Sequence, residues 1–169
     1  MRTTPKTPDT HTNVLSRRTL LAMAGAVGAA ASLPGNARAL VTNGAALDGE
    51  LLGVQPDTWA DQGKAITQAL ETAARQGKAL FLPPGRYVAT RIELPAGGHL
   101  AGARGQTSML GQGEAPILAT RGARDAAISG IDFDDRFKAA DNRTGMVMLE
   151  DCAGLRIRDC SFRAAIRPM

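Results

Sequence analysis

The stretch Ala79-Leu80-Phe81-Leu82-Pro83-Pro84-Gly85-Arg86-Tyr87-Val88 decides the fold of this chain. It opens with a short apolar run, which is typical of a strand buried in a core. Pro83 cannot donate a hydrogen bond to a sheet and therefore ends that strand. Pro84 and Gly85 fit the second and third positions of a type II turn, where the third residue takes a positive φ. A second strand begins at Tyr87, so the stretch predicts two short strands joined by a corner, as in a coiled β-solenoid.

Downstream of this stretch, the sequence repeats with a period of about 29 residues. Residues 117–133 align with residues 146–162 without a gap, which places Ile128 opposite Ile157. A shorter match, at an offset of 28, begins at His99. Apolar residues alternate within each repeat, which indicates strands rather than helices. Repeats of this length bury their apolar face by stacking on their neighbours, so we expect three short strands per turn, with glycine-rich corners.

Residues 1–39 resemble the twin-arginine export signal of bacteria. Arg17 and Arg18 precede a weakly apolar stretch, and Ala37 and Ala39 form a small-x-small cleavage site. In signals of this class the arginine pair is read by a receptor rather than by lipid. The resemblance implies that the twin-arginine export machinery is a partner, that cleavage follows Ala39, and that the mature protein is periplasmic or secreted.

The charge of the chain is concentrated in this N-terminal segment. The whole chain has 20 basic and 16 acidic residues, and residues 1–39 contain five of the former and one of the latter, which leaves 15 of each sign in residues 40–169. This neutral mature part does not support a nucleic-acid interface. No apolar run reaches the ~18 residues that a membrane span needs, so we expect no stable span in the mature chain.

A helix is expected over residues 57–77. Asp57 and Thr58 are candidate N-cap residues. Apolar side chains then recur at helical spacing from Ile66 to Ala73, and the opposite face is polar. Because the open ends of a solenoid must be covered, we expect this amphipathic helix to cap the first turn of the coil.

Two single residues have both a structural and a functional interpretation. Trp59 is expected to plug the end of the core, and the alternative is a platform on which a ligand stacks. His99 is the only histidine after the predicted cleavage site. Since no partner for a general base can be identified, we interpret it as a polar residue that flanks a turn.

Cys152 and Cys160 are the two cysteines of the chain. Two cysteines cannot complete a tetrahedral zinc site. The twin-arginine route, as the resemblance implies, carries proteins that have already folded in the reducing cytoplasm. We therefore favour two small apolar core or corner residues with free thiols over a disulfide.

Residues 53–61, with Ile66 and Leu70 and the stretch 79–88, resemble the start of pectate-lyase-like right-handed parallel β-helices. With the twin-arginine signal in front, the chain is most similar to a family of exported bacterial repeat proteins of uncharacterised function. Gln62 and Gly63 depart from the acidic motif usual near the cap of that family. The resemblance implies an all-β fold, a right-handed parallel β-helix (solenoid) with an N-terminal capping α-helix, preceded by a signal peptide. The expected divisions are a signal peptide over 1–39, a linker and entry to the first rung over 40–56, a capping helix over 57–77, and β-helix rungs over 78–169.

Polysaccharide lyases of this superfamily hold calcium with carboxylates on a strand face, next to an arginine or lysine base. The candidate residues for such a site are Asp132, Asp134, Asp135, Asp159, Arg136 and Arg158. Calcium takes six to eight converging oxygen ligands, whereas two adjacent aspartates on a strand point to opposite sides. Asp132 also falls opposite Ser161 of the next repeat, so no acidic ladder forms. We therefore expect solvated corner charges and no metal ion or cofactor, and we assign no catalytic residue.

Two classes of function follow from these observations. The first is an exported, non-catalytic β-helix protein of the cell envelope or the extracellular space that associates with polysaccharide. The second is the N-terminal portion of a polysaccharide lyase or glycoside hydrolase, which would carry stacked aspartates on one face. A phage-type tailspike is a third idea, although a tailspike needs no twin-arginine signal. Residues 164–169 follow a strand without a capping element, so we also expect a chain truncated at its C-terminus.

Overall fold

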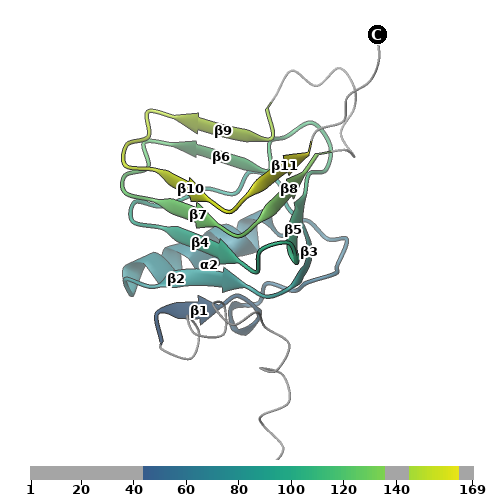
Figure 1. Cartoon of the computed structure of the whole chain (residues 1–169), viewed down its shortest axis with the longest axis horizontal. Helices are drawn as coiled ribbons and strands as arrows, with labels where there is room; N and C mark the ends of the chain where they lie inside the picture. Colours follow the sequence, from purple (N-terminus) through teal and green to yellow (C-terminus); the bar gives the residue numbers. More distant parts are fainter. Residues whose placement is uncertain (1–43, 136–144, 164–169) are drawn as a thin grey trace, which may run out of the picture. The chain divides into compact units, whose positions relative to one another are not determined.

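Three parallel sheets wind around one core in the part of the chain that the computed structural model describes, residues 44–135 and 145–163 (Figure 1). Sheet A has the order β1 (Ala46–Asp48), β2 (Ala79–Leu82), β4 (His99–Gly102), β7 (Ala127–Ser129) and β10 (Arg156–Arg158). Sheet B has the order β3 (Gly85–Val88), β5 (Thr107–Leu110), β8 (Asp132–Asp134) and β11 (Ser161–Arg163). Sheet C consists of β6 (Leu118–Arg121) and β9 (Val147–Glu150).

The chain visits the three sheets in turn and then returns to the first one. After β4 in sheet A come β5 in sheet B and β6 in sheet C, and the next coil repeats this order with β7, β8 and β9. Each strand therefore pairs in parallel with the strand one full coil away, and not with its neighbour in sequence (Figure 1). This topology confirms the prediction of a parallel β-helix with three strands per turn.

The register of the later coils follows the sequence repeat. Ile128 lies opposite Ile157, as the offset of about 29 predicts. The offset of 28 before it is also confirmed, because His99 pairs with Ala127. An earlier coil is shorter, since Ala79 pairs with His99 only 20 residues later. The corners differ in length. The connection from sheet A to sheet B stays short, whereas the connection from sheet B to sheet C lengthens along the chain.

The first coil includes a strand from the segment 40–56, which was predicted as a linker and entry to the first rung. The described part of this segment contains β1 and the 3-10 helix η2 (Glu50–Leu52). Ala46 pairs with Ala79 of β2, so β1 is already a strand of sheet A. With only three residues, β1 is too short to show the alternation that identifies a strand in sequence.

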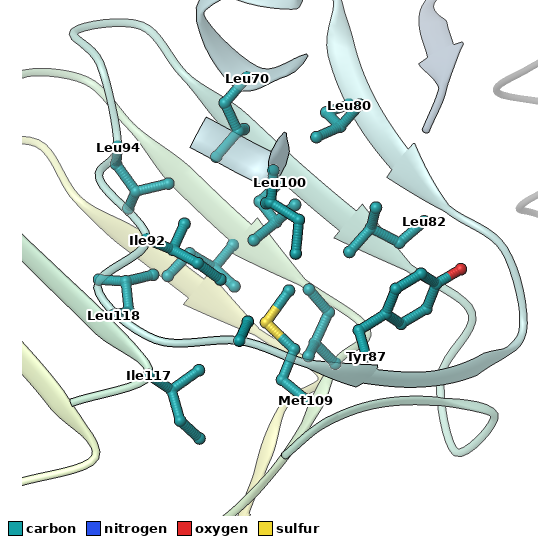
Figure 2. Close-up of a cluster of buried hydrophobic side chains, with 14 of the residues drawn as sticks. Leu70, Leu80, Leu82, Tyr87, Ile92, Leu94, Leu100, Met109, Ile117 and Leu118 are labelled. Carbon is teal, nitrogen blue, oxygen red and sulfur yellow. The ribbon is translucent and has the colours of Figure 1, made fainter. Parts of the chain in front are cut away.

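The helix α2 (Gly63–Arg75) buries one face in the core. Ile66, Leu70 and Ala73 are fully buried on that face, at the spacing that places side chains on one side of a helix. The helix packs against β2 and β4, and Figure 2 shows Leu70 among the buried side chains of the strands. The predicted amphipathic helix is therefore present, whereas its role as an end cap stays a prediction.

The helix begins at residue 63, six residues later than the predicted start at 57. Asp57 has a left-handed backbone, with φ of 57°, and Thr58 forms a parallel bridge with Tyr87 of β3. These two residues therefore belong to the coil rather than to a helix N-terminus. The N-cap position is occupied by Gln62, whose side chain does not cap the helix.

The core is built from the inward side chains of all three sheets (Figure 2). Leu80 and Leu100 come from sheet A, Met109 and Tyr87 from sheet B, and Leu118 from sheet C, and all of them are buried. The Tyr87 hydroxyl donates a hydrogen bond to a backbone carbonyl at the preceding corner, 3.0 Å away. This bond satisfies the polar end of a side chain that is otherwise in apolar surroundings.

Gly85 is required by a close approach between coils. A Cβ atom at this position would lie 2.5 Å from Cβ of Pro56 in the preceding coil. Its φ is 150°, whereas the third residue of a type II turn has a φ near +80°. The prediction of a type II turn is therefore wrong, although the positive φ and the corner itself are present.

Cys152 and Cys160 are both free thiols, as predicted. Both are half-buried and pack against the core. The Cys152 thiol lies 3.3 Å from the Glu150 carbonyl oxygen and the Cys160 thiol 3.2 Å from that of Arg158. Burial raises the pKa of the Cys160 thiol above its ordinary value, which keeps this side chain protonated and apolar.

The predicted signal peptide lies outside the described residues. Arg17, Arg18, Ala37 and Ala39 all belong to this part of the chain, so the signal and its cleavage site stay predictions. Within residues 44–135 and 145–163, no helix has both the length and the apolar character that crossing a membrane requires.

Candidate functional site

The aspartates that the sequence singled out on sheet B do not converge on a common site. Asp132 accepts a hydrogen bond of 2.6 Å from the hydroxyl of Ser161, the residue opposite it in register. Asp134 lies opposite Arg163. Asp134 and Asp135 are both buried, so the prediction of solvated corner charges is wrong for these two. Their backbone groups bond to the coils on both sides: the Gly111 N–H donates to the Asp134 carbonyl, and the Asp135 N–H donates to the Arg163 carbonyl.

The remaining candidates are dispersed. Asp159 lies at a corner with φ of 54° and pairs with Arg104 at 3.1 Å, with both side chains largely exposed. Arg158 and His99 are exposed on sheet A, and Arg136 lies outside the described residues. Within residues 44–135 and 145–163, no three His, Cys, Asp or Glu side chains gather closely enough to bind a metal ion.

The outward side of sheet C carries a polar groove that the sequence did not single out. Ala119 lies opposite Met148, and Arg121 lies opposite Glu150. Glu93 belongs to the short segment that bridges to β6 on the other edge. The groove is open to solvent and is lined by Glu93, Ala119, Thr120, Arg121, Met148 and Glu150.

One charge pair lies in this groove. Nε of Arg121 donates to Oε2 of Glu150 at 2.8 Å, and a second guanidinium nitrogen donates to the same oxygen. Exposed ion pairs of this kind contribute only about 0–1 kcal/mol to stability. The pair places a carboxylate and a guanidinium next to each other on the surface of the sheet.

A second groove continues from the first along the side of α2. It lies between the helix and the segment that follows β3, is open to solvent, and shares Glu93 with the first groove. We call the two together the sheet C trough. The second groove is lined by Asp61, Lys64, Thr67, Gln68, Glu71, Thr90, Arg91 and Glu93.

Hydrogen bonds between α2 and the strand segment fix the walls of the trough. The Asp61 carboxylate accepts bonds from the backbone N–H of Gly63 at 2.8 Å and of Thr90 at 3.1 Å, and also from the Thr90 hydroxyl. The Thr67 hydroxyl accepts a bond of 3.1 Å from the backbone N–H of Glu93. Asp61, just before α2, and Thr67 within it therefore supply side-chain oxygens to the segment 90–93, where a further strand would supply carbonyl groups.

The repeat itself contains the signal that could have identified this trough. The offset of 29 that pairs Ile128 with Ile157 also pairs Arg121 with Glu150. Both side chains point outward because they alternate with inward residues on their strands. Opposite charges that are separated by the repeat length and lie on the outward side indicate a cross-strand pair. The contribution of α2 to the trough depends on tertiary packing and cannot be obtained from the repeat.

Trp59 does not plug the core, and that prediction is wrong. Its side chain is 71% exposed, because the bridge between Thr58 and Tyr87 places this segment at the free edge of sheet B, beside β3. The Arg86 guanidinium lies over the indole, with Cζ 5.9 Å from the ring centroid. The alternative interpretation, a platform for a ligand, is compatible with this position.

No protein-family model matches the chain, and a search of curated proteins found no relative. Among the solved structures that are similar to it in fold are three with a TM-score above 0.5. One is PfbA, a surface adhesin of Streptococcus pneumoniae, with 17% sequence identity and a TM-score of 0.57. The other two are A-modules of mannuronan C-5 epimerases from Azotobacter vinelandii. AlgE6 has 20% sequence identity and a TM-score of 0.58, and AlgE4 has 19% sequence identity and a TM-score of 0.56. The matches cover 69%, 69% and 68% of this chain and 33%, 37% and 37% of those chains. The chain thus spans about a third of the length of these structures, and the likeness shows that it shares their parallel β-helix fold.

Proposed function

We propose that this chain is an exported bacterial β-helix protein that binds a polysaccharide along the sheet C trough without cleaving it. The observation that carries the proposal is the pair Arg121–Glu150 with Glu93 beside it, because these groups line one open groove across neighbouring strands. Parallel strands lie about 4.8 Å apart, so Arg121 and Glu150 place a donor and an acceptor on adjacent strands of the trough.

The chemistry of the trough suits a chain that carries many hydroxyl groups. Lys64 and Gln68 lie one helical turn apart on the wall formed by α2, and they supply donors, while Glu71 and Glu93 supply acceptors. Acids and bases are nearly balanced, so the trough does not select for a strongly charged ligand. Its large open volume fits an extended ligand better than a small enclosed one.

The expected location of the protein supports the same ligand class. Arg17 and Arg18 predict export by the twin-arginine machinery, which would bring the mature chain to the periplasm or the exterior. Of the similar structures, one is a surface adhesin and two are modules of mannuronan epimerases. These proteins support an extracytoplasmic, glycan-associated function, and the particular glycan is a matter for experiment.

The test is a binding screen of the mature chain against immobilised plant, algal and bacterial polysaccharides, followed by affinity electrophoresis with each one that binds. We expect the double variant Glu93→Gln and Arg121→Gln to bind at least about tenfold more weakly, since hydrogen bonds to charged groups are lost. Arg156→Gln, on the exposed side of β10 in sheet A, is the matched control and should bind like the parent. Equal binding by the double variant and the parent would refute the proposal.

A second candidate function is the N-terminal portion of a polysaccharide lyase or glycoside hydrolase. It is favoured by the presence of two carboxylates, Glu93 and Glu150, in one groove, because glycoside hydrolases commonly use a pair of carboxyl groups. Release of reducing ends or of unsaturated uronates would reveal this activity. Product that disappears in Glu93→Gln would establish cleavage and replace the non-catalytic proposal.

A further inference from the structure

An exposed indole is the feature of this molecule that the sheet C trough does not explain. Trp59 is the single tryptophan of the chain, and its side chain is mostly in solvent. Large aromatic side chains are generally well buried, so an exposed one next to other apolar groups points to an interaction site. Its neighbours therefore decide which ligand it fits.

The floor beside Trp59 is apolar. Val88 and Leu110 are paired in register on β3 and β5. They lie on the outward side of sheet B, since the residues before them, Tyr87 and Met109, point into the core. Nevertheless they are only 4% and 7% exposed. A groove of about 530 Å³ lies over them and is lined by Trp59, Val88, Leu110, Gly111 and Gln112.

The pair Asp57–Arg86, which we call the polar fork, lies next to the indole, with Cζ of Arg86 5.9 Å from the ring centroid. Oδ1 of Asp57 accepts bonds from the backbone N–H of Arg86 at 3.2 Å and from its Nε at 3.3 Å. The described residues provide no hydrogen-bond partner for the terminal nitrogens of Arg86. Asp57, Arg86 and Trp59 line one small depression together with Val88 and Leu110.

We propose that Trp59, the floor of Val88 and Leu110, and the Asp57–Arg86 pair form a binding site for one pyranose ring. One face of a pyranose presents C–H groups, which stack on an indole, and its rim presents hydroxyl groups. Two adjacent hydroxyls match the pair, because one donates to the Asp57 carboxylate and the other accepts from the Arg86 guanidinium. An acetamido methyl on the ring would lie on the apolar floor.

This site is independent of the proposed function. None of the residues that line it also lines the sheet C trough. A purely structural role for Trp59, as a cover for Val88 and Leu110, predicts a loss of stability on substitution and no response to any sugar. The two interpretations therefore differ in a directly measurable way.

The single tryptophan makes the test direct. The fluorescence of the mature chain is titrated with trimers of N-acetylglucosamine and, separately, with trimers of glucose. We expect a saturable change and at least twofold protection of Trp59 from quenching by acrylamide with one or both series. A preference for the N-acetyl series would assign the floor to the acetamido group. If neither series changes the fluorescence or the quenching, the proposal is wrong.

Two variants and one control separate this site from the trough. Arg86→Gln should weaken the fluorescence response at least about fivefold, and so should Asp57→Asn, which keeps a residue that tolerates the left-handed backbone. The trough variant Glu93→Gln with Arg121→Gln should retain the full Trp59 response. Circular dichroism establishes that each variant is folded. A response that persists in both fork variants, or that disappears in the trough variant, would overturn the assignment.

Discussion

The ring of Phe162 lies flat on the ring of Phe133, with centroids 5.1 Å apart and an angle of 4° between the planes. The two residues hold equivalent positions in consecutive coils, yet Phe133 is 1% exposed and Phe162 is 48% exposed. The energetic contribution of a side chain in this solenoid should therefore depend on how many coils enclose it.

Truncating these two rings tests that dependence. Phe133→Ala should lower the free energy of unfolding by about 3–5 kcal/mol, the range for a buried phenylalanine. Phe162→Ala should lower it by less than half as much, since its ring already contacts water. Chemical denaturation followed by circular dichroism gives both values. Equal losses would show that both rings are enclosed to the same degree in solution.

Gly63 should not tolerate even a methyl group. A Cβ atom there would overlap the carbonyl group of Thr90, so Gly63→Ala should destabilise the fold by about 1–3 kcal/mol, although alanine is the better helix former. Lys64→Ala, at the next position of α2 but exposed, is the matched control. It should change the free energy of unfolding by at most about 0.5 kcal/mol, and a neutral Gly63→Ala would contradict the observed packing.

The stability of the fold should decline at alkaline pH because of Tyr87. Burial raises the pKa of this phenol above its ordinary value, and the carboxylates of Glu50, Asp48 and Asp57 raise it further. In the unfolded chain the phenol ionises near pH 10, whereas in the folded chain it stays neutral. Its contribution is therefore present below about pH 10 and is lost as the pH rises through the folded-state pKa.

Because Tyr87 is the single tyrosine, the absorbance of phenolate reports on it alone. This absorbance should appear together with the loss of the circular dichroism signal. The free energy of unfolding of Tyr87→Phe should fall less steeply above pH 10 than that of the parent. Phenolate that forms while the chain is still folded would contradict a buried, neutral phenol.

Export by the twin-arginine route can be tested in cells. Replacing Arg17 and Arg18 with lysine should leave uncleaved precursor in the cytoplasm, because the receptor reads the arginine pair. Arg2→Lys, outside the motif, is the control and should be processed after Ala39 like the parent. Immunoblots of fractionated cells give both outcomes, and normal processing of the double variant would exclude this route.

The coil was predictable because the spacing of apolar residues along the sequence repeats with the period of the coil. The match of Ile128 with Ile157 required only the offset, and the structure has the same register. The positions of Trp59 and of the start of α2 could not be obtained in this way. They depend on the bridge between Thr58 and Tyr87, a contact between distant residues that forms only once the second coil is present.

The candidate site was less predictable than the fold for a related reason. The candidate carboxylates Asp132 and Asp134 stand out in the sequence by their spacing, and in the structure they lie opposite Ser161 and Arg163 in sheet B. The pair Arg121–Glu150 lies on the outward side of a different sheet, and the trough also needs Glu93 and the side of α2. Pairing residues at the observed offset identifies the charge pair, but not the groove.

The corners of the coil differ in length, so the length of the chain is constrained at some corners and can vary at another. Between β7 and β8 only two residues separate sheet A from sheet B, while the step from Asp134 to Val147 is much longer. Extra residues are thus inserted at the corner that enters sheet C, and the stacking of the other two sheets is unchanged. A lineage, or an engineer, can therefore alter the border of the sheet C trough one coil at a time without changing the register that stabilises the fold.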